Sequence, residues 1–324
     1  MFSNIPSIKA LQNDIILKSA SGDAACTEPM VSVVTVCFNP LKDGREELFV
    51  KNLESVQQQV GVTVEHIIID GASSDGTLEF LKAFDNRRYN IRILSKADDG
   101  IYDAMNRGIA LSRGKYVTFL NSDDFYHRHN GLALSVKVLE ESGCSFSFAP
   151  ILPEGSRFLH RLHRHPQLHL HRIFISQTIP HQSMLYRRTV LIDVDGYDPS
   201  YRMGGDHDLT LRLIAAGHKA CFVDEAFVTF AAGGFSTQNN TLKLREKKRR
   251  VKRFHHKVFG VEFSNEDADT LVRRYRYPRK YLPIYVASQQ MIGQTFVGVP
   301  QSLCHRALYR FNFWKYYFKC QLSI

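Results

Sequence analysis

Clusters of oxygen-bearing side chains stand where hydrophobic segments end, and their types suit the handling of a charged ligand. The richest cluster is Asn121-Ser-Asp123-Asp124, which directly follows the apolar segment 116–120. Carboxylate and amide oxygens are the ligands that Mg²⁺ and Mn²⁺ prefer in proteins. We therefore expect a divalent-cation site with Asp123 and Asp124 as its ligands. A capped turn is the alternative interpretation of the same residues.

A repeated pattern of strand, turn and helix positions these oxygens. Segments rich in β-branched residues end at turns, at 30–38, 64–70, 91–94 and 115–121. Helical patterns follow at about 45–60 and 101–111, and the small residues of 71–77 can open another helix. This alternation predicts an α/β fold with a mostly parallel sheet and crossover helices. Ligands bind outside the carboxyl ends of parallel strands, so we expect Asp70, Asp98 and Asp123 to face one cleft.

Five segments occur in an order that resembles the family 2 glycosyltransferases with the GT-A fold, near the bacterial enzymes that build surface polysaccharides. These segments are 33–39, 70–77, 98–108, 120–124 and 204–212. The resemblance covers about residues 29 to 240 and implies a Rossmann-like, inverting glycosyltransferase. The implied reaction moves a sugar from a nucleotide-diphosphate donor, expected to be a UDP-sugar, to a glycan or lipid-linked glycan acceptor in polysaccharide biosynthesis.

The resemblance assigns donor-binding roles to particular residues. Phe38 occupies the place of an aromatic that stacks on the base, Asp70 that of an acid that reads the base edge, and Asp98 that of a further donor-pocket acid. A core aromatic and a turn cap are the alternative interpretations of Phe38 and Asp70. Asp123 falls in the metal motif, where Mn²⁺ or Mg²⁺ cancels the charge of the departing diphosphate.

Two acids of the family pattern are changed. Asn121 stands where the family has the first Asp of the metal motif. At the start of segment 204–212, the position of the family's acidic pair reads Gly205-Asp206. Asp206 is therefore the candidate general base, which removes a proton from an acceptor hydroxyl. The two changes keep a second hypothesis open, a non-catalytic glycosyltransferase-like module that binds a nucleotide-sugar or a glycan.

Further contacts follow from the same resemblance. His181, Gly234 and Ser236 are expected to contact the leaving phosphate or the acceptor, with a structural histidine and an ordinary turn as alternatives. Asp103 and Asn106 lie three residues apart on one helical face, so donor contacts and helix capping both remain open.

The positive charge is concentrated in the C-terminal part of the chain. The net charge is +10, and residues 241–324 hold 18 of the 42 Lys and Arg but only 5 of the 32 acidic residues. Segment 243–257 predicts a basic amphipathic helix, and aromatic residues follow it. Such composition suits an anionic membrane surface that carries a polyprenyl-diphosphate-linked acceptor. A helical subdomain packed on the core is the alternative. We divide the chain into an arm (1–28), a catalytic domain (29–240) and a basic helical extension (241–324).

Other classes of protein fit less well. A nucleotidyltransferase calls for a glycine-rich loop after the first strand, and segment 39–45 lacks one. A nucleic-acid-binding protein leaves the acidic cleft unexplained, because acids repel phosphates. Polar residues interrupt the most apolar stretch, 281–300, and the N-terminus lacks a secretory pattern. The six cysteines are scattered, which is consistent with reduced thiols. We expect a cytoplasmic protein, held peripherally on the inner face of the cell membrane.

Overall fold

The computed structural model describes residues 7–8, 10–11, 28–42, 44–84, 91–153, 165–231 and 240–299. Within these ranges the strands are β1 (Val31–Cys37), β2 (Val64–Asp70), β3 (Ile91–Ser95), β4 (Tyr116–Phe119), β5 (Phe125–Tyr126), β6 (Phe146–Phe148), β7 (Ile151–Pro153), β8 (Leu185–Arg187), β9 (Ala220–Phe222), β10 (Val228–Phe230) and β11 (Phe296–Val297). The α-helices are α2 (Glu46–Gln57), α3 (Thr77–Ala83), α4 (Ile101–Leu111), α5 (Gly131–Ser142), α7 (Arg188–Asp193), α8 (Gly205–Ala215), α9 (Asn240–Phe259), α10 (Asn265–Arg274) and α11 (Leu282–Thr295). Short 3₁₀ helices lie at η1 (Pro166–Arg172), η2 (His181–Ser183) and η4 (Arg279–Tyr281).

A mostly parallel sheet is the centre of the molecule. Its eight described strands run in the order β11-β9-β6-β8-β4-β1-β2-β3, and a small sheet β5-β10-β7 lies beside it. Strand β1 is parallel to both β2 and β4, and its last residue, Cys37, pairs with Asp70. Strand β8 is antiparallel to both of its neighbours. The predicted α/β fold with a mostly parallel sheet is therefore confirmed.

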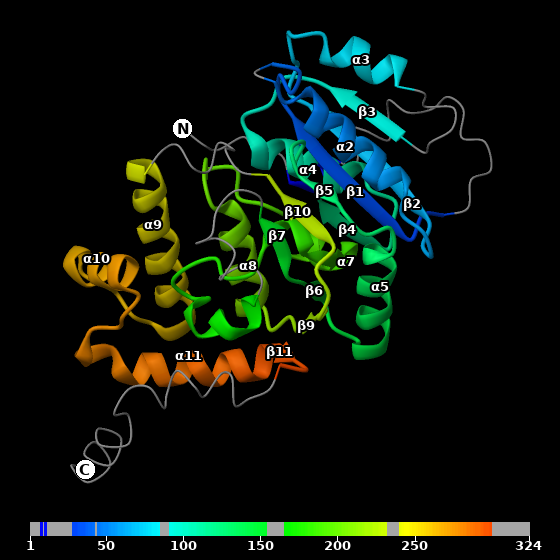
Figure 1. The fold of residues 1–324 in the computed structure, drawn as a ribbon. Coiled ribbons are helices and arrows are strands. Elements are labelled where there is room, and N and C mark those ends of the chain that lie inside the picture. The colour runs from blue at the N-terminus through cyan, green and yellow to red at the C-terminus, as the bar shows by residue number, and fades with distance from the viewer. Residues whose placement is uncertain are drawn as a thin grey trace.

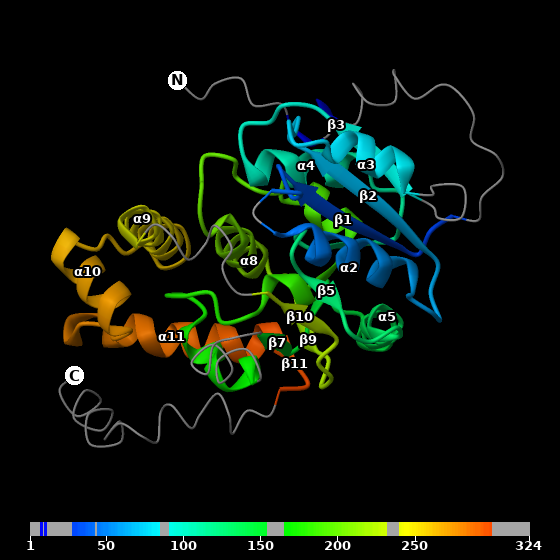
Figure 2. The same cartoon turned by 45° about the horizontal axis from the view of Figure 1, so that its top comes forward.

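Helices cover both faces of this sheet, as Figures 1 and 2 show. Alternate residues of β1 point to opposite faces, because side chains alternate along a strand. Val34 and Val36 belong to the core cluster formed with α4, α7 and α8. Val31 and Val33 belong to the cluster formed with α2 and α5. Strands buried on both faces explain the near-continuous apolar segments of the sequence.

The C-terminal region packs directly on the catalytic core. Helix α9 contributes Phe254 to the main core cluster, and Ile292 of α11 and Phe296 of β11 join the same cluster. Strand β11 pairs in parallel with β9 and so forms one edge of the central sheet (Figure 1). The predicted helix at 243–257 lies inside α9. The division of the chain at residue 240 remains a prediction, and both sides of that division contribute strands to one sheet.

The N-terminal arm is described at only a few residues, and one of them is anchored. Ile8 is 1% exposed within the main core cluster, and its backbone N–H donates to Asp195 Oδ1 over 3.0 Å. This part of the expected loose arm is therefore packed on the domain.

Among the helices of the described ranges, none has both the length and the apolar character that crossing a bilayer requires.

Candidate functional site at the carboxyl edge of the sheet

Phe38, Gly71 and Asp98 come together where β1, β2 and β3 end. The Phe38 side chain is 68% exposed, which is unusual for a large apolar residue directly after a buried strand. Gly71 separates it from Asp98, and a Cβ placed on Gly71 would lie 3.3 Å from Phe38 Cδ2 and 2.7 Å from Asp98 Oδ2. An exposed ring, a bare backbone and a carboxylate thus lie side by side and form one rim of the carboxyl edge. The core-aromatic alternative for Phe38 does not fit this exposure.

Asp70 lies below this rim and is completely buried. Its carboxylate accepts hydrogen bonds from the Ser73 N–H at 3.2 Å, from the Ser73 hydroxyl and from Ser95 Oγ at 2.6 Å. These bonds fix the turn after β2 and its junction with β3. Base reading by Asp70 stays a prediction, and the observed contacts are those of a turn-stabilising carboxylate.

The start of α4 supplies more polar groups to the same edge. Asp98 Oδ1 accepts from the Gly100 N–H at 2.9 Å. Asp103 accepts from the Asp99 N–H at 3.1 Å and pairs with Arg107 at 2.7 Å. Asn106 exchanges two hydrogen bonds with the backbone of Tyr197, at 2.8 and 2.9 Å. Of the two alternatives for Asp103 and Asn106, the contacts favour the structural one.

The loop after β4 carries the predicted metal ligands. Asp123 keeps 18% of its side chain exposed, and Arg45 Nη1 lies 3.9 Å from its Oδ2. Asp124 is fully buried, and its Oδ1 accepts from the Ala231 N–H at 3.0 Å. Burial raises the pKa of both carboxyl groups, and for Asp124 the charge of Asp123 raises it further.

The donor set of this loop fits a divalent cation. The buried Asn121 Oδ1 has no hydrogen-bond partner among the described residues, although its Nδ2 donates to Asp124 Oδ2 at 3.3 Å. An unpartnered amide oxygen and a partly exposed carboxylate, two residues apart in the chain, are oxygen ligands of the kind that Mg²⁺ and Mn²⁺ prefer. The described residues contain no group of three or more His, Cys, Asp or Glu placed to hold a metal. The diphosphate of a donor would therefore have to supply further ligands, as is usual for Mg²⁺.

A buried chain of hydrogen bonds supports this loop from below. Asn52 of α2 donates from Nδ2 to the carbonyls of Asn121 and Asp124, both at 2.8 Å. Its Oδ1 accepts from Thr35 Oγ1 at 3.3 Å, and Thr35 Oγ1 lies 2.9 Å from His66 Nε2. Burial lowers the pKa of His66 to about 3, so the ring is neutral at pH 7. The backbone of the loop is thereby held without using the side-chain oxygens of Asn121 or Asp123.

Asp206 stands in the first turn of α8, directly after Gly205. A Cβ on Gly205 would lie 2.8 Å from the ring of Tyr102, so this ring occupies the space beside the helix start. The missing acid of the pair therefore has a physical reason, because a side chain at position 205 would collide with Tyr102.

His181 lies in a buried aromatic cluster with Phe119 and Tyr197. Its Nε2 is 2.6 Å from the Tyr197 hydroxyl, and its ring stacks on Phe119 at 5.6 Å. The side chain is 7% exposed, and burial lowers its pKa, while the charge of Asp206 acts in the opposite direction. One ring nitrogen is thus occupied inside the protein. A phosphate or acceptor contact by His181 stays a prediction. Gly234 and Ser236 lie outside the described residues.

Two arginines at this edge were missed by the sequence analysis. Arg45 precedes α2 and approaches Asp123, as described above. The exposed Arg202 reaches from the loop before α8 to the start of α4, where its guanidinium donates to the Asp99 carbonyl. Its Nη1 would lie 2.6 Å from a Cβ on Gly100. No sequence signal pointed to either arginine, because each contact joins residues far apart in the chain.

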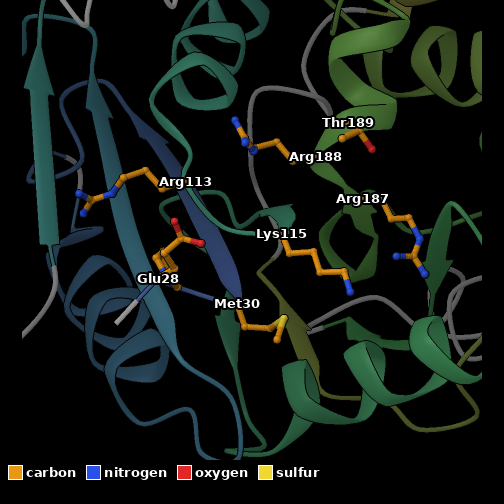
Figure 3. A pocket seen from close by; sticks show the side chains of 8 residues that line it. Glu28, Met30, Arg113, Lys115, Arg187, Arg188 and Thr189 are labelled. Atoms are coloured by element: carbon orange, nitrogen blue, oxygen red, sulfur yellow. The ribbon is translucent and has the colours of Figure 1, made fainter. Parts of the chain in front are cut away.

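A second hollow lies at the opposite, amino edge of the sheet, with a volume of about 480 Å³ (Figure 3). Its lining includes four basic side chains, namely Arg113, Lys115, Arg187 and Arg188. Arg113 pairs with Glu65 at 3.4 Å, and Lys115 pairs with Glu140. Arg187 donates to the Cys144 carbonyl at 2.8 Å. Figure 3 shows Arg113 and Arg187 extending to opposite sides, so these cations do not converge on one ligand.

Comparison with known proteins identifies the family. The family model described as "Glycosyl transferase family 2" matches residues 32–194. A PGL/p-HBAD biosynthesis glycosyltransferase of Mycobacterium tuberculosis is 28% identical over 179 residues, which cover 55% of this chain and 65% of that protein. A protein of the same species described as an uncharacterized glycosyltransferase is 31% identical over 187 residues, covering 57% of this chain and 68% of that protein. The chain thus spans just under two thirds of the first of these relatives.

Solved structures share the fold at low sequence identity. The mannosyltransferase PcManGT from Pyrobaculum calidifontis, in complex with GDP-Man and Mn²⁺, has a TM-score of 0.56 and 14% identity, and the match covers 96% of this chain and 90% of that chain. Residues 1–349 of TarS from S. aureus, in complex with UDP-GlcNAc, have a TM-score of 0.53 and 15% identity, with 84% and 82% covered. Both matches extend beyond residues 32–194 into the C-terminal helices.

Proposed function

The chain belongs to glycosyl transferase family 2. From this premise we propose that it is a glycosyltransferase that transfers a sugar from a UDP-sugar, with inversion, to a glycan or lipid-linked glycan acceptor in polysaccharide biosynthesis. One observation carries the proposal. The carboxyl edge of the sheet holds an exposed aromatic, Phe38, and an unpartnered oxygen, Asn121 Oδ1, and the start of α8 with Asp206 packs through Gly205 against Tyr102 of α4.

The proposed donor position follows from these groups. The base stacks on Phe38, and the ribose side faces Asp98 across the Gly71 backbone, where a larger residue would fill the space. The diphosphate lies over the loop 121–124. A bound divalent cation supplies charge neutralisation for the leaving diphosphate, and Asn121 Oδ1 and Asp123 would hold it. Asp124 is a weaker candidate ligand than predicted, because its carboxylate is buried and bonded to Ala231.

Asp206 is the proposed general base. Its carboxylate stands in the first turn of α8. An ionised carboxylate can accept the proton of an acceptor hydroxyl as that oxygen attacks the anomeric carbon. The neighbouring Tyr102, Tyr186 and Tyr197 feel the charge of Asp206, which adds to burial in raising their pKa, so their hydroxyls stay protonated.

The acceptor side of the proposal rests on charge. Lys243, Arg245 and Lys257 are exposed on α9. Each basic residue near an anionic membrane surface contributes about 1 kcal/mol of binding. We therefore propose peripheral attachment to such a surface and a polyprenyl-diphosphate-linked acceptor. A biosynthetic glycosyltransferase among the relatives is consistent with this role.

The test is calorimetric titration of the purified protein with UDP, GDP and dTDP, each with and without Mn²⁺. We expect UDP to bind to the wild-type protein when Mn²⁺ is present. In the Asp123→Ala variant, addition of Mn²⁺ should no longer strengthen UDP binding. A preference for GDP would replace the donor assignment and keep the site. Failure of every nucleotide to bind would overturn the donor site. Nucleotide binding by the wild-type protein that does not depend on Mn²⁺ would contradict the role of Asp123 as a metal ligand.

A further inference from the structure

Helix α9 contacts the segment 198–204, which leads to α8, the helix that carries the proposed base Asp206. Four of its side chains face this segment, at positions 246, 249, 250 and 253, which is the spacing of one helical face. Arg253 pairs with Asp198 at 2.8 Å, and the Arg249 guanidinium lies 4.0 Å from the centre of the Tyr201 ring. These two arginines are about half exposed. The two buried members, Glu246 and Arg250, contact the backbone of the segment.

Glu246 binds the backbone of the segment with both of its oxygens. It is 6% exposed, although it lies in a helix that is otherwise strongly basic. Oε1 accepts from the Arg202 N–H at 2.9 Å, and Oε2 accepts from the Met203 N–H at 2.7 Å. Hydrogen bonds to a charged acceptor are about twice as strong as neutral ones. A buried carboxylate thus fixes two successive peptide groups.

Arg250, one helical turn after Glu246, contacts the same segment. Its Nη1 donates to the Met203 carbonyl at 2.9 Å, so Met203 is held at both its N–H and its C=O. The same guanidinium lies 2.5–2.6 Å from where a Cβ of Gly204 would be. Gly204 has φ +73°, a left-handed conformation that favours glycine. It is the residue from which α8 starts, and Asp206 follows two residues later.

We propose that Glu246 and Arg250 are positioning residues for the base Asp206, so that α9 is a working part of the active site as well as a packed extension. They fix the backbone of 202–204, and this backbone sets where α8 begins and where the Asp206 carboxylate stands. The same segment carries Arg202, whose guanidinium touches the start of α4 beside Asp98. The contacts of Glu246 and Arg250 therefore align the Asp206 carboxylate with the proposed donor site at Phe38, Gly71 and Asp98. This inference rests on the proposed role of Asp206.

Glu246→Gln in the full-length protein tests the proposal. The Gln amide has one oxygen and one NH₂ group, so one of the two backbone N–H groups would face a donor and lose its acceptor. A shift of the base by about 1 Å can cost up to about 100-fold in rate. We expect kcat to fall about 10- to 100-fold, with UDP affinity and donor KM within about twofold, because Phe38 and Asp123 are untouched. The assay is UDP release, with Mn²⁺, from the UDP-sugar that the wild type turns over.

Glu65→Gln is the matched control at the other edge of the sheet. Glu65 is also a buried glutamate that accepts from two successive backbone N–H groups, those of Arg113 and Gly114. Its loss should destabilise the fold and leave kcat per folded molecule unchanged. Hydrogen exchange of residues 198–206 gives a direct readout, and exchange there should accelerate in Glu246→Gln and stay at the wild-type rate in Glu65→Gln.

The outcomes distinguish a failure of the base assignment from a failure of the positioning role. If Asp206→Asn keeps the wild-type kcat, the base assignment fails, whatever Glu246→Gln does. If Asp206→Asn loses kcat but Glu246→Gln keeps it in a folded protein, the positioning role fails alone. Equal losses of kcat in Glu246→Gln and Glu65→Gln would also reject it, since both would then report general destabilisation. Partial activity in Glu246→Gln, with less in Glu246→Ala and normal UDP affinity in both, supports it.

Discussion

The two edges of the central sheet use the same residue types in opposite ways. At the amino edge, Glu65 is buried and pairs with Arg92 and Arg113, and it also accepts from Ser32 Oγ at 2.6 Å. At the carboxyl edge, Asn121 Oδ1 has no partner among the described residues, and Phe38 remains mostly exposed. Both edges are polar and contain arginines, but within the described ranges the carboxyl edge leaves the Asn121 Oδ1 oxygen unpartnered, whereas the Glu65 carboxylate at the amino edge is fully engaged.

This difference separates groups that stabilise the protein from groups that are available to a ligand. A buried polar atom without a partner costs about 1–3 kcal/mol, so its persistence calls for a ligand that pays this cost. The hollow at the amino edge is lined by four basic side chains, yet Arg113, Lys115 and Arg187 are bonded within the protein. At the carboxyl edge, the unpartnered Asn121 Oδ1 is therefore the group we assign to a ligand.

The largest expected effect is on catalysis at the carboxyl edge. Asp206→Asn should lower kcat about 10²- to 10⁴-fold, because the amide cannot accept the acceptor proton. Unfolding in urea should give a free energy within about 0.5 kcal/mol of the wild type. Glu140→Gln, which changes an acid of the Lys115 pair at the amino edge, serves as the control and should keep kcat. A similar loss of kcat in both variants would erase the contrast between the edges.

The next effect is on stability at the amino edge. Glu65→Ala should lower the free energy of unfolding by about 3 kcal/mol, because it leaves the Arg92 and Arg113 charges and two backbone N–H groups without their acceptor. Urea unfolding measures this change, and nucleotide titration of the folded variant should match the wild type. Weakened UDP binding at full stability would show that the amino edge also serves the donor.

Acid should weaken the support below the metal loop. Burial lowers the pKa of His66 to about 3 from 6.5, so between these values the unfolded chain binds a proton that the folded protein does not. The free energy of unfolding therefore falls as pH decreases from 6.5, by about 2 kcal/mol at about pH 5. Urea unfolding at both pH values should show a smaller decrease for His66→Gln. An identical decrease in the two proteins would exclude His66 as the cause.

The smallest expected effect concerns the exposed ring. Phe38→Ala should weaken UDP binding about 10-fold, the loss of one base–aromatic stack. Its stability should stay within about 0.5 kcal/mol of the wild type, because the side chain is 68% exposed. Calorimetry and urea unfolding measure the two quantities. Destabilisation with unchanged UDP affinity would instead make Phe38 a packing residue.

Much of the fold could be predicted from the sequence, because apolar periodicity and turn residues act locally. The helix at 101–111 agrees with α4 at both ends, and the helix expected at about 45–60 begins at Glu46 and ends at Gln57. Pairing between distant segments was less accessible. Strand β11 is only two residues long and gives no periodic signal, so its place beside β9 could not be foreseen.

The candidate site shows the same limit. The acids at strand ends were predictable because parallel strands bring their carboxyl ends together. Which oxygens are already bonded depends on partners far away in sequence, such as Asn52 for the metal loop and Ala231 for Asp124. Glu246 looked like one acid in a basic run, and its contacts with Arg202 and Met203 arise only in the folded chain.

The pairing of β11 with β9 has a consequence for biosynthesis. Strand β9 (Ala220–Phe222) receives its outer neighbour only from residues 296–297, which the ribosome makes some seventy-five positions later. Until then one side of β9 presents unpaired backbone groups, which are templates for aggregation. The sheet therefore closes late, through a contact of long sequence separation, and such contacts slow folding. A nascent chain halted before β11 should need a chaperone to protect that side.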